Sequence, residues 1–275
     1  MNTQFKAAVI QLCTSNDAIM AFAELEEQVR AAAKAGAKLI LTPEGSNFLE
    51  RDPSKFAQIC PLETDAQVLN QYQKLAKELG IILIIGSALF RRENAKAANR
   101  CLVFNENGEL ISQYDKIHLF DVNLGAGMEL QESKTYAPGQ KAVIANTNLG
   151  DIGLSICYDV RFPHLYRALA QYGAKIITIP AAFTVPTGRA HWEILLRARA
   201  IETGAFILAA AQAGSHKDGR QTYGHSMIIS PWGEILTQMD GTEIGFAMAE
   251  IDLRLVDEAR RKIPAWGLNQ GFDGP

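Results

Sequence analysis

Cys157 lies in the stretch GDIGLSICYDVRFP (150–163), where an apolar run gives way to a tyrosine, a carboxylate and a cation. A cysteine at the end of a buried strand is a candidate nucleophile, because a thiolate attacks carbonyl carbons. Free cysteine is also among the most buried residue types, so the alternative is a small side chain that fills the core. A catalytic role requires a base for the thiol and a cation for the charge that its attack creates.

Glu44 and Lys116 are the candidates for that base and that cation. Glu44 ends the run LILTPEGS, and Lys116 ends another run in QYDKIHLF, so both are expected at strand ends, where α/β folds place functional groups. The alternatives are a loop or helix-capping acid and a solvated surface lysine. Together with Cys157 they could hydrolyse an amide. Glu44 would take the thiol proton, Cys157 would attack the carbonyl carbon, and Lys116 would stabilise the oxyanion.

The elements that position these residues alternate along the chain. Apolar runs predict strands at 5–12, 38–44, 81–90, 101–106, 109–116, 142–147, 151–157, 174–183, 205–214, 223–230, 234–239 and 245–252. Helical spacing predicts helices around 22–32, at 68–79, after Pro163, at 191–203 and at 253–263. Two halves with the same β-α-β-α-β-β order predict the α/β class, as a four-layer α-β-β-α sandwich of two mixed β-sheets.

The domain organisation follows from length and composition. The chain has 275 residues, of which 48% are hydrophobic, and no linker rich in Gly, Pro or Ser separates its halves, so we expect a single domain over 1–275. The end, PAWGLNQGFDGP (264–275), reads as a loop that needs a partner surface to be ordered. The charged stretches 51–56 and 91–100 are expected to be solvated loops.

Charge and hydropathy exclude several classes of protein. The net charge is −3 and basic residues are interspersed with acids, so the basic patch of a nucleic-acid binder is missing. No stretch approaches the ~18 apolar residues of a membrane span. The start, MNTQFKAAVIQL, has no signal-peptide cleavage pattern, which favours a cytoplasmic protein.

Cysteine spacing bears on metals and cofactors. Cys13, Cys60, Cys101 and Cys157 form no CxxC pair and have no histidine at zinc-site spacing, so in a reducing compartment they are expected to be thiols. No glycine-rich phosphate loop of the Walker type is present. We therefore expect a small-molecule substrate, no metal and no organic cofactor.

Three motifs taken together resemble those of a known family. LTPEGS with Glu44, YDKIHLF with Lys116 and LSICYDVRFP with Cys157 occur in the order typical of the nitrilase superfamily, the carbon–nitrogen hydrolases. The resemblance runs from Ala7 to about Pro264 and implies the same four-layer sandwich. It also implies a homo-oligomer, at least a dimer, in which helices near the nucleophile and the C-terminal tail pair.

Two longer segments narrow the resemblance to one branch. PAAFTVPTGRAHWEILLRARAIETGAFILAAAQAG and YGHSMIISPWGEIL are similar to the branch that holds the ω-amidases and the amidases acting on deaminated glutathione, and RARAIET followed by AAAQAG favours the latter. The resemblance therefore implies an amide substrate rather than a nitrile. It implies a thioester mechanism on a small carboxylate-bearing amide such as deaminated glutathione, in a metabolite-repair role that releases ammonia or an amine.

The resemblance also assigns roles to individual residues. It implies that Glu44 is the general base, and that Lys116 and the backbone N–H of Tyr158 hold the oxyanion formed when Cys157 attacks. Glu132, in LQESKTYAPG, matches a second glutamate beside the lysine. There it would keep Lys116 charged and raise the pKa of Glu44 by like-charge repulsion. The alternative for Glu132 is an exposed loop acid.

Arg161 follows Cys157 by four residues and allows two interpretations. Its planar guanidinium could bind a substrate carboxylate through two parallel hydrogen bonds. The interpretation that we favour from sequence alone is an internal salt bridge to Asp159 or to another acid. On that basis substrate specificity is not assigned to Arg161, although it remains a candidate binding residue.

Other activities remain as alternatives. An ω-amidase acting on α-ketoglutaramate or succinamate and an N-carbamoyl amide hydrolase would use the same residues on different substrates. A Cys-His hydrolase would need His118, His191 or His225 as base, but we expect these histidines to brace loops by hydrogen bonding. A non-catalytic binding module that keeps the fold is disfavoured, because all three catalytic residue types are present.

Overall fold

The first of two central sheets contains the strand that precedes Glu44 and the strand that precedes Lys116. The computed structural model describes residues 3–93, 95–125 and 129–274. Within these ranges the six strands lie in the order β16-β1-β2-β3-β4-β5. They are β1 (Gln4–Gln11), β2 (Leu39–Leu41), β3 (Ile82–Arg92), β4 (Ala95–Phe104), β5 (Leu110–Asp115) and β16 (Gly245–Asp252). β1, β2 and β3 are parallel, whereas β16, β4 and β5 pair antiparallel, so the sheet is mixed.

The second sheet repeats this arrangement and contains the strand that precedes Cys157. Its order is β15-β14-β11-β10-β9-β8. The strands are β8 (Ile144–Thr147), β9 (Gly150–Leu154), β10 (Ile176–Thr178), β11 (Phe206–Ala209), β14 (Met227–Ile229) and β15 (Ile235–Gln238). β9, β10 and β11 are parallel, and the outer strands pair antiparallel. Two-stranded ribbons, β6 (Asp121–Asn123) with β7 (Glu129–Gln131) and β12 (Ala213–Ser215) with β13 (Gln221–Tyr223), lie outside the sheets.

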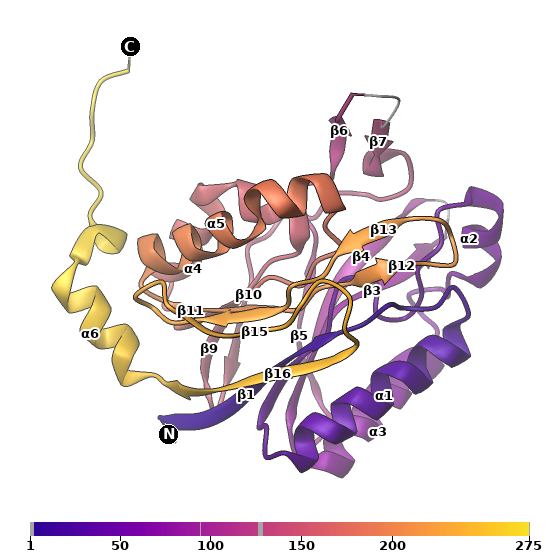
Figure 1. Ribbon diagram of the computed structural model, residues 1–275, viewed down its shortest axis with the longest axis horizontal. Helices are drawn as coiled ribbons and strands as arrows, with labels where there is room; N and C mark the ends of the chain where they lie inside the picture. The colour runs from indigo at the N-terminus through magenta and orange to yellow at the C-terminus, as the bar shows by residue number, and fades with distance from the viewer. Residues whose placement is uncertain (1–2, 94, 126–128, 275) are drawn as a thin grey trace.

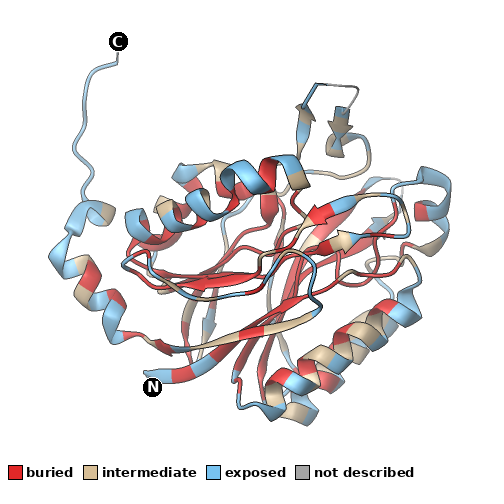
Figure 2. Ribbon diagram, in the orientation of Figure 1, coloured by how far each residue is buried: buried red, intermediate tan, exposed pale blue. Residues whose placement is uncertain are grey.

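Helices cover the outer face of each sheet. α1 (Ala18–Lys34) and α3 (Ala66–Leu79) lie against the first sheet, and α4 (Pro163–Gln171) and α5 (Val185–Thr203) lie against the second (Figure 1). Alternate residues of β1 belong to two different cores. Val9 lies in the cluster that joins the two sheets, and Ile10 lies with Leu25 and Tyr72 in the cluster under α1 and α3. The buried residues accordingly follow the strands and the inner faces of the helices (Figure 2). The predicted four-layer sandwich is confirmed.

The helix boundaries follow from local capping. Asp17 and Asp65 accept hydrogen bonds from backbone N–H groups in the first turns of α1 and α3, and α3 ends at Gly80 in the left-handed conformation. α5 begins at Val185 rather than near His191, because Pro186 is tolerated in the first turn of a helix. Within the described ranges, no helix has both the length and the apolar character needed to cross a membrane.

Two segments expected to be solvated loops are regular structure. In 51–56, Asp52 caps a short helix, α2 (Pro53–Ile59), whose Phe56 is buried. In 91–100, the chain completes the hairpin of β3 and β4. The expectation of loops was wrong, although residues 51–55 are exposed to solvent as expected. In the hairpin the charges are neutralised locally, because Arg92 and Arg100 each lie 2.6 Å from a carboxylate oxygen of Asp115.

The C-terminal segment contacts the body of its own chain before it extends outward. After α6 (Arg254–Lys262), the short helix η3 (Pro264–Gly267) lies against α4, where Gln171 donates a hydrogen bond to the carbonyl of Trp266 at 3.2 Å. The Arg260 guanidinium lies 4.6 Å from the centre of the Trp266 ring. Asn269, just beyond η3, still accepts a hydrogen bond from Gln171 at 2.9 Å, and the chain after it points away from the sandwich (Figure 1). Its packing on a partner subunit stays a prediction.

Candidate active site

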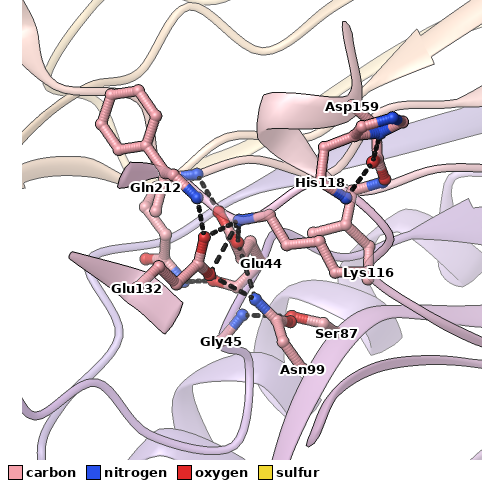
Figure 3. Close-up of polar contacts among 12 residues, drawn as sticks. Glu44, Gly45, Ser87, Asn99, Lys116, His118, Glu132, Asp159 and Gln212 are labelled. Atoms are coloured by element: carbon pink, nitrogen blue, oxygen red, sulfur yellow. Dashed lines mark hydrogen bonds and ion pairs between the residues drawn. The ribbon is translucent and has the colours of Figure 1, made fainter. Parts of the chain in front are cut away.

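Glu44, Lys116 and Cys157 come together from the two facing sheets. Glu44 follows β2, Lys116 follows β5, and Cys157 begins the short helix η2 (Cys157–Arg161) after β9. Lys116 Nζ donates a hydrogen bond to Glu44 Oε1 at 2.8 Å (Figure 3). All three residues are nearly removed from water: Glu44 is 7% exposed, Lys116 is 2% exposed and Cys157 is 8% exposed. In such surroundings charges interact strongly.

The Glu44 carboxylate is held on both of its oxygens. Oε1 accepts from Lys116 and from Asn99 Nδ2 at 2.9 Å, and Oε2 accepts from the backbone N–H of Ala182 at 2.9 Å. Its own backbone carbonyl accepts from Gln212 Nε2 at 2.9 Å. Hydrogen bonds to both oxygens fix the orientation of the carboxylate before any substrate arrives.

The pKa of Glu44 lies below its ordinary value. Burial alone would raise the pKa, but the charge of Lys116 and hydrogen bonds from Lys116, Cys157 and Asn99 outweigh burial. The expectation that repulsion from Glu132 raises this pKa is therefore wrong, because the lysine lies between the acids and bonds to both. Glu44 is an ionised acceptor at neutral pH.

Lys116 is clamped between two carboxylates. Nζ lies 2.9 Å from each carboxylate oxygen of Glu132, which begins the short helix η1 (Glu132–Lys134). Glu132 Oε2 also accepts from the backbone N–H of Phe120 at 2.7 Å. Burial lowers the pKa of Lys116, but the charges of Glu132 and Glu44 outweigh it and raise the pKa well above the ordinary value. Lys116 is therefore a cation held between two acids.

Cys157 lies on a strained turn. Its φ is 49°, in the left-handed region that non-glycine residues rarely adopt, and its N–H donates to the carbonyl of Pro180 at 2.8 Å. Burial, followed by the charge of Glu44, raises the pKa of the thiol well above its ordinary value, with Lys116 opposing. The thiol is protonated at neutral pH and therefore needs a base in place to become a nucleophile.

Close approach of two loops beneath the site depends on Gly86. A Cβ at this position would lie 1.9 Å from the carbonyl oxygen of Thr42 and 2.3 Å from Cβ of Pro180. Thr42 leads into the Glu44 loop, and Pro180 accepts the hydrogen bond from Cys157. A side chain at Gly86 would push apart the segments that carry the acid and the thiol.

Asp159 joins the lysine segment to the cysteine segment. This fully buried carboxylate accepts hydrogen bonds from the hydroxyl of Tyr114 at 2.7 Å, from the backbone N–H of Ile156 at 2.8 Å and from the backbone N–H of His118 at 3.0 Å. His118 Nδ1 lies 2.7 Å from the same carboxylate (Figure 3). Ile156 precedes Cys157, and His118 follows Lys116 by two residues. One side chain therefore sets the relative position of both segments.

Arg161 is not paired as expected. The salt bridge to Asp159 was a wrong expectation, because Asp159 bonds Tyr114, Ile156 and His118, and no carboxylate of the described ranges lies within ion-pair distance of Arg161. Arg161 Nη2 instead lies 3.3 Å from His191 Nδ1, and its guanidinium carbon lies 5.6 Å from the centre of the Phe183 ring. No acidic side chain of the described ranges neutralises the positive charge of Arg161.

Tyr158 and His225 are the last two residues to be placed of those singled out in the sequence. Tyr158, the second residue of η2, is half-buried, and its ring meets Phe120 edge-on at 4.8 Å between centroids. Its backbone N–H lies at the N-terminal end of the short helix, where such groups lack partners within the helix. His225 Nδ1 contacts the carbonyl of Tyr223 at 2.7 Å, consistent with loop bracing.

Sequence reasoning missed Asn99. It falls in the segment 91–100 that we expected to be a loop, yet its side chain is 3% exposed and bonds to Glu44. A signal was present, because alternate residues of a strand face the same side. Extending the predicted strand at Cys101 backwards by two residues would have aimed Asn99 toward the space between the sheets.

Solved structures identify the class of protein. The structure matches a crystal structure of a C. elegans NitFhit protein with a TM-score of 0.91 at 34% identity, covering 98% of this chain and 65% of that chain. This chain thus spans less than two thirds of that longer protein. A Saccharomyces cerevisiae member of branch 10 of the nitrilase superfamily matches with a TM-score of 0.85 at 29% identity, covering 95% of each chain. The fold is that of the nitrilase superfamily.

Sequence comparisons then place the chain within it. Residues 6–261 match the carbon-nitrogen hydrolase family. A deaminated glutathione amidase of Synechocystis sp. is 38% identical, covering 95% of this chain and 96% of the relative. The Homo sapiens deaminated glutathione amidase is 40% identical, covering 94% of this chain and 80% of the relative. The chain belongs to the carbon–nitrogen hydrolase family, and the prediction that it is an amidase is confirmed.

Proposed function

We propose that this amidase hydrolyses a small carboxylate-bearing amide through a thioester on Cys157, with deaminated glutathione as its substrate. The contact between the charged Lys116 and Glu44, beside a thiol that burial keeps protonated, supports the proposal most directly. An ionised acid and a protonated thiol are the starting states for general-base catalysis. The two deaminated glutathione amidases described above support the choice of substrate.

In the first half of the reaction Glu44 takes the thiol proton as the sulfur attacks the amide carbonyl carbon. The carbonyl oxygen becomes an oxyanion, for which Lys116 Nζ and the backbone N–H of Tyr158 are the donors. Lys116 has three N–H groups and three carboxylate oxygens within 2.9 Å, so an oxyanion must compete with Glu132 for a donor. The tetrahedral intermediate collapses when Glu44 returns the proton to the leaving nitrogen.

In the second half Glu44 acts on water. The ionised carboxylate accepts a proton from a water molecule as the oxygen attacks the thioester carbonyl carbon. The new oxyanion uses the same donors, and its collapse expels the sulfur, which regains the proton from Glu44. The acid product leaves, and the resting protonation states return. Glu132 takes no part in proton transfer in this scheme and holds Lys116 in place.

Arg161 is the proposed reader of the substrate carboxylate. Its guanidinium has no acidic partner in the described ranges, and it follows the nucleophile within η2. A guanidinium binds a carboxylate through two parallel hydrogen bonds, which also orients the substrate. An Arg161→Lys variant keeps the charge and loses the planar fork. We expect it to raise KM for a carboxylate-bearing amide more than for its uncharged methyl ester.

A panel of amides tests the substrate. The purified protein is assayed with deaminated glutathione, α-ketoglutaramate, succinamate and an N-carbamoyl amino acid, with Cys157→Ala as the blank, and release of ammonia or amine is measured. We expect the highest kcat/KM for deaminated glutathione. A higher value for α-ketoglutaramate would replace this substrate with that of an ω-amidase, and equal rates for Cys157→Ala would reject the thiol mechanism.

A further inference from the structure

Asn99 binds both glutamates of the site with one amide group. Its Nδ2 lies 2.9 Å from Glu44 Oε1 and 3.4 Å from Glu132 Oε1, and its side chain comes from β4, between the strands that lead to the acid and the lysine (Figure 3). Its backbone carbonyl accepts from the N–H of Lys116 at 3.0 Å. One residue thus contacts all three charged members of the site.

The other end of the same amide has no partner. Asn99 Oδ1 is buried and accepts no hydrogen bond within the described ranges. A buried acceptor left without a partner destabilises the folded state, because it loses its hydrogen bonds to water and gains none in return. The reversed orientation of the amide would be worse, because it would place Oδ1 against two carboxylate oxygens. The orientation is therefore set by the two acids, and the unpaired oxygen is the stability cost of placing an N–H₂ group there.

Asn99 and Lys116 together determine which oxygen of Glu44 faces the thiol. Both donate to Oε1. Within the described ranges Oε2 accepts one hydrogen bond, from the backbone N–H of Ala182, so Oε2 keeps a free lone pair for the thiol proton. The same N–H lowers the pKa of the Cys157 thiol, in keeping with this arrangement. Without the Asn99 amide, Lys116 would be the one remaining donor to Oε1 in the described part of the chain. The carboxylate would then be freer to rotate about the bond between Cγ and Cδ.

We propose that Asn99 is a positioning residue that holds Glu44 with Oε2 toward Cys157, while tethering Glu132 on the other side of Lys116. The proposal rests on the proposed function, in which Glu44 is the base. It predicts a specific effect on ionisation as well as on geometry. The amide donates to the charged form of Glu44, so its removal raises the pKa of that carboxyl, and the base is lost at a higher pH than in the wild type.

The test compares Asn99→Ala with Asn47→Ala. Asn47 is also a buried asparagine, but its side chain bonds the backbone of Leu89 at 2.9 and 2.8 Å, so the control reports the general cost of removing a buried amide. For each variant, kcat, KM and the pH dependence of kcat/KM are measured with the best amide of the panel. For Asn99→Ala we expect kcat to fall about 10-fold or more, and the acid limb of kcat/KM to move to higher pH. For Asn47→Ala the acid limb should stay in place.

A second readout does not depend on turnover. The rate at which acrylamide alkylates Cys157 is followed by intact-protein mass spectrometry across pH, and its acid limb reports the ionisation of Glu44. We expect the same upward shift in Asn99→Ala, or in Asn99→Ser if the alanine variant does not fold. Unshifted acid limbs in both readouts would overturn the role of Asn99. If the wild type hydrolyses no amide, the proposed function fails, and the alkylation profile still decides the question about Asn99.

Discussion

At the residue scale, Cys157 is held in its unreactive form. Burial and the charge of Glu44 raise the pKa of the Cys157 thiol. The pKa of Glu44 is lowered, because the charge of Lys116 and the hydrogen bonds to the carboxylate outweigh the effect of burial. A low-pKa thiolate would react with any electrophile that reached it. A protonated thiol beside an ionised base becomes nucleophilic only when the base takes its proton, which couples reactivity to a correctly placed carbonyl group.

Glu44→Gln separates the two effects of the carboxylate. The substitution removes a negative charge and a proton acceptor from the thiol, so the pKa of Cys157 should be lower than in the wild type. Turnover should nevertheless fall about 10²- to 10⁴-fold, because the base is gone. The thiol pKa is measured by ultraviolet absorbance of the thiolate, against Cys157→Ala as background. An unchanged kcat in Glu44→Gln would remove Glu44 from its proposed role.

At the element scale, the site depends on contacts between the segments that follow β2, β5 and β9. The segments carrying Glu44, Lys116 and Cys157 come from different strands of two sheets, and each is fastened by backbone hydrogen bonds to a neighbour. Asp159 links two of them, because η2 turns its carboxylate back toward β5. A buried carboxylate that accepts several hydrogen bonds stabilises the fold only while all of its donors stay in place.

Asp159→Ala should therefore destabilise the protein strongly. The change leaves the Tyr114 hydroxyl and the N–H groups of Ile156 and His118 without their acceptor, and we expect the free energy of unfolding to fall by about 3 kcal/mol or more. Tyr114→Phe is the matched control, because it removes one donor and leaves the carboxylate, at a cost of about 1–2 kcal/mol. Urea denaturation measures both. Equal losses in the two variants would show that Asp159 does not join the segments.

At the scale of the whole molecule, exposed apolar side chains mark the outer face of the second sheet's helices. Ile194 and Ile201 on α5 are 69% and 56% exposed, and their spacing of seven places them on one face of that helix. Tyr172, directly after α4, is 81% exposed. These helices follow the nucleophile in the chain. The predicted homodimer would bury this face against a second copy.

Ile194→Asp combined with Ile201→Asp tests that expectation. Two charges on the face should convert a dimer to a monomer without loss of helical signal, because burying an unpaired charge is costly. Ile19→Asp is the control, since Ile19 is 84% exposed on α1, on the opposite side of the sandwich. Light scattering gives the molar mass of each. A dimer that persists in the double variant would place the interface elsewhere.

The sequence predicted the sandwich and the three motif residues because apolar periodicity and strand ends are local signals. It could not predict partners that arise from distant segments. Arg161 was assigned to Asp159 because they are neighbours in sequence, whereas Tyr114 and His118 reach Asp159 from the other sheet. Asn99 was hidden in a charged hairpin, where the polar composition masked the alternation of a strand.

The most direct test of the central claim is to trap the acyl group on Cys157. The enzyme is quenched in acid during turnover of the preferred amide, digested, and analysed by mass spectrometry. The account predicts that the peptide containing Cys157 gains the mass of the acyl fragment, and that Cys157→Ala shows neither adduct nor turnover. Turnover by Cys157→Ala, or an acyl group found on another residue, would contradict it.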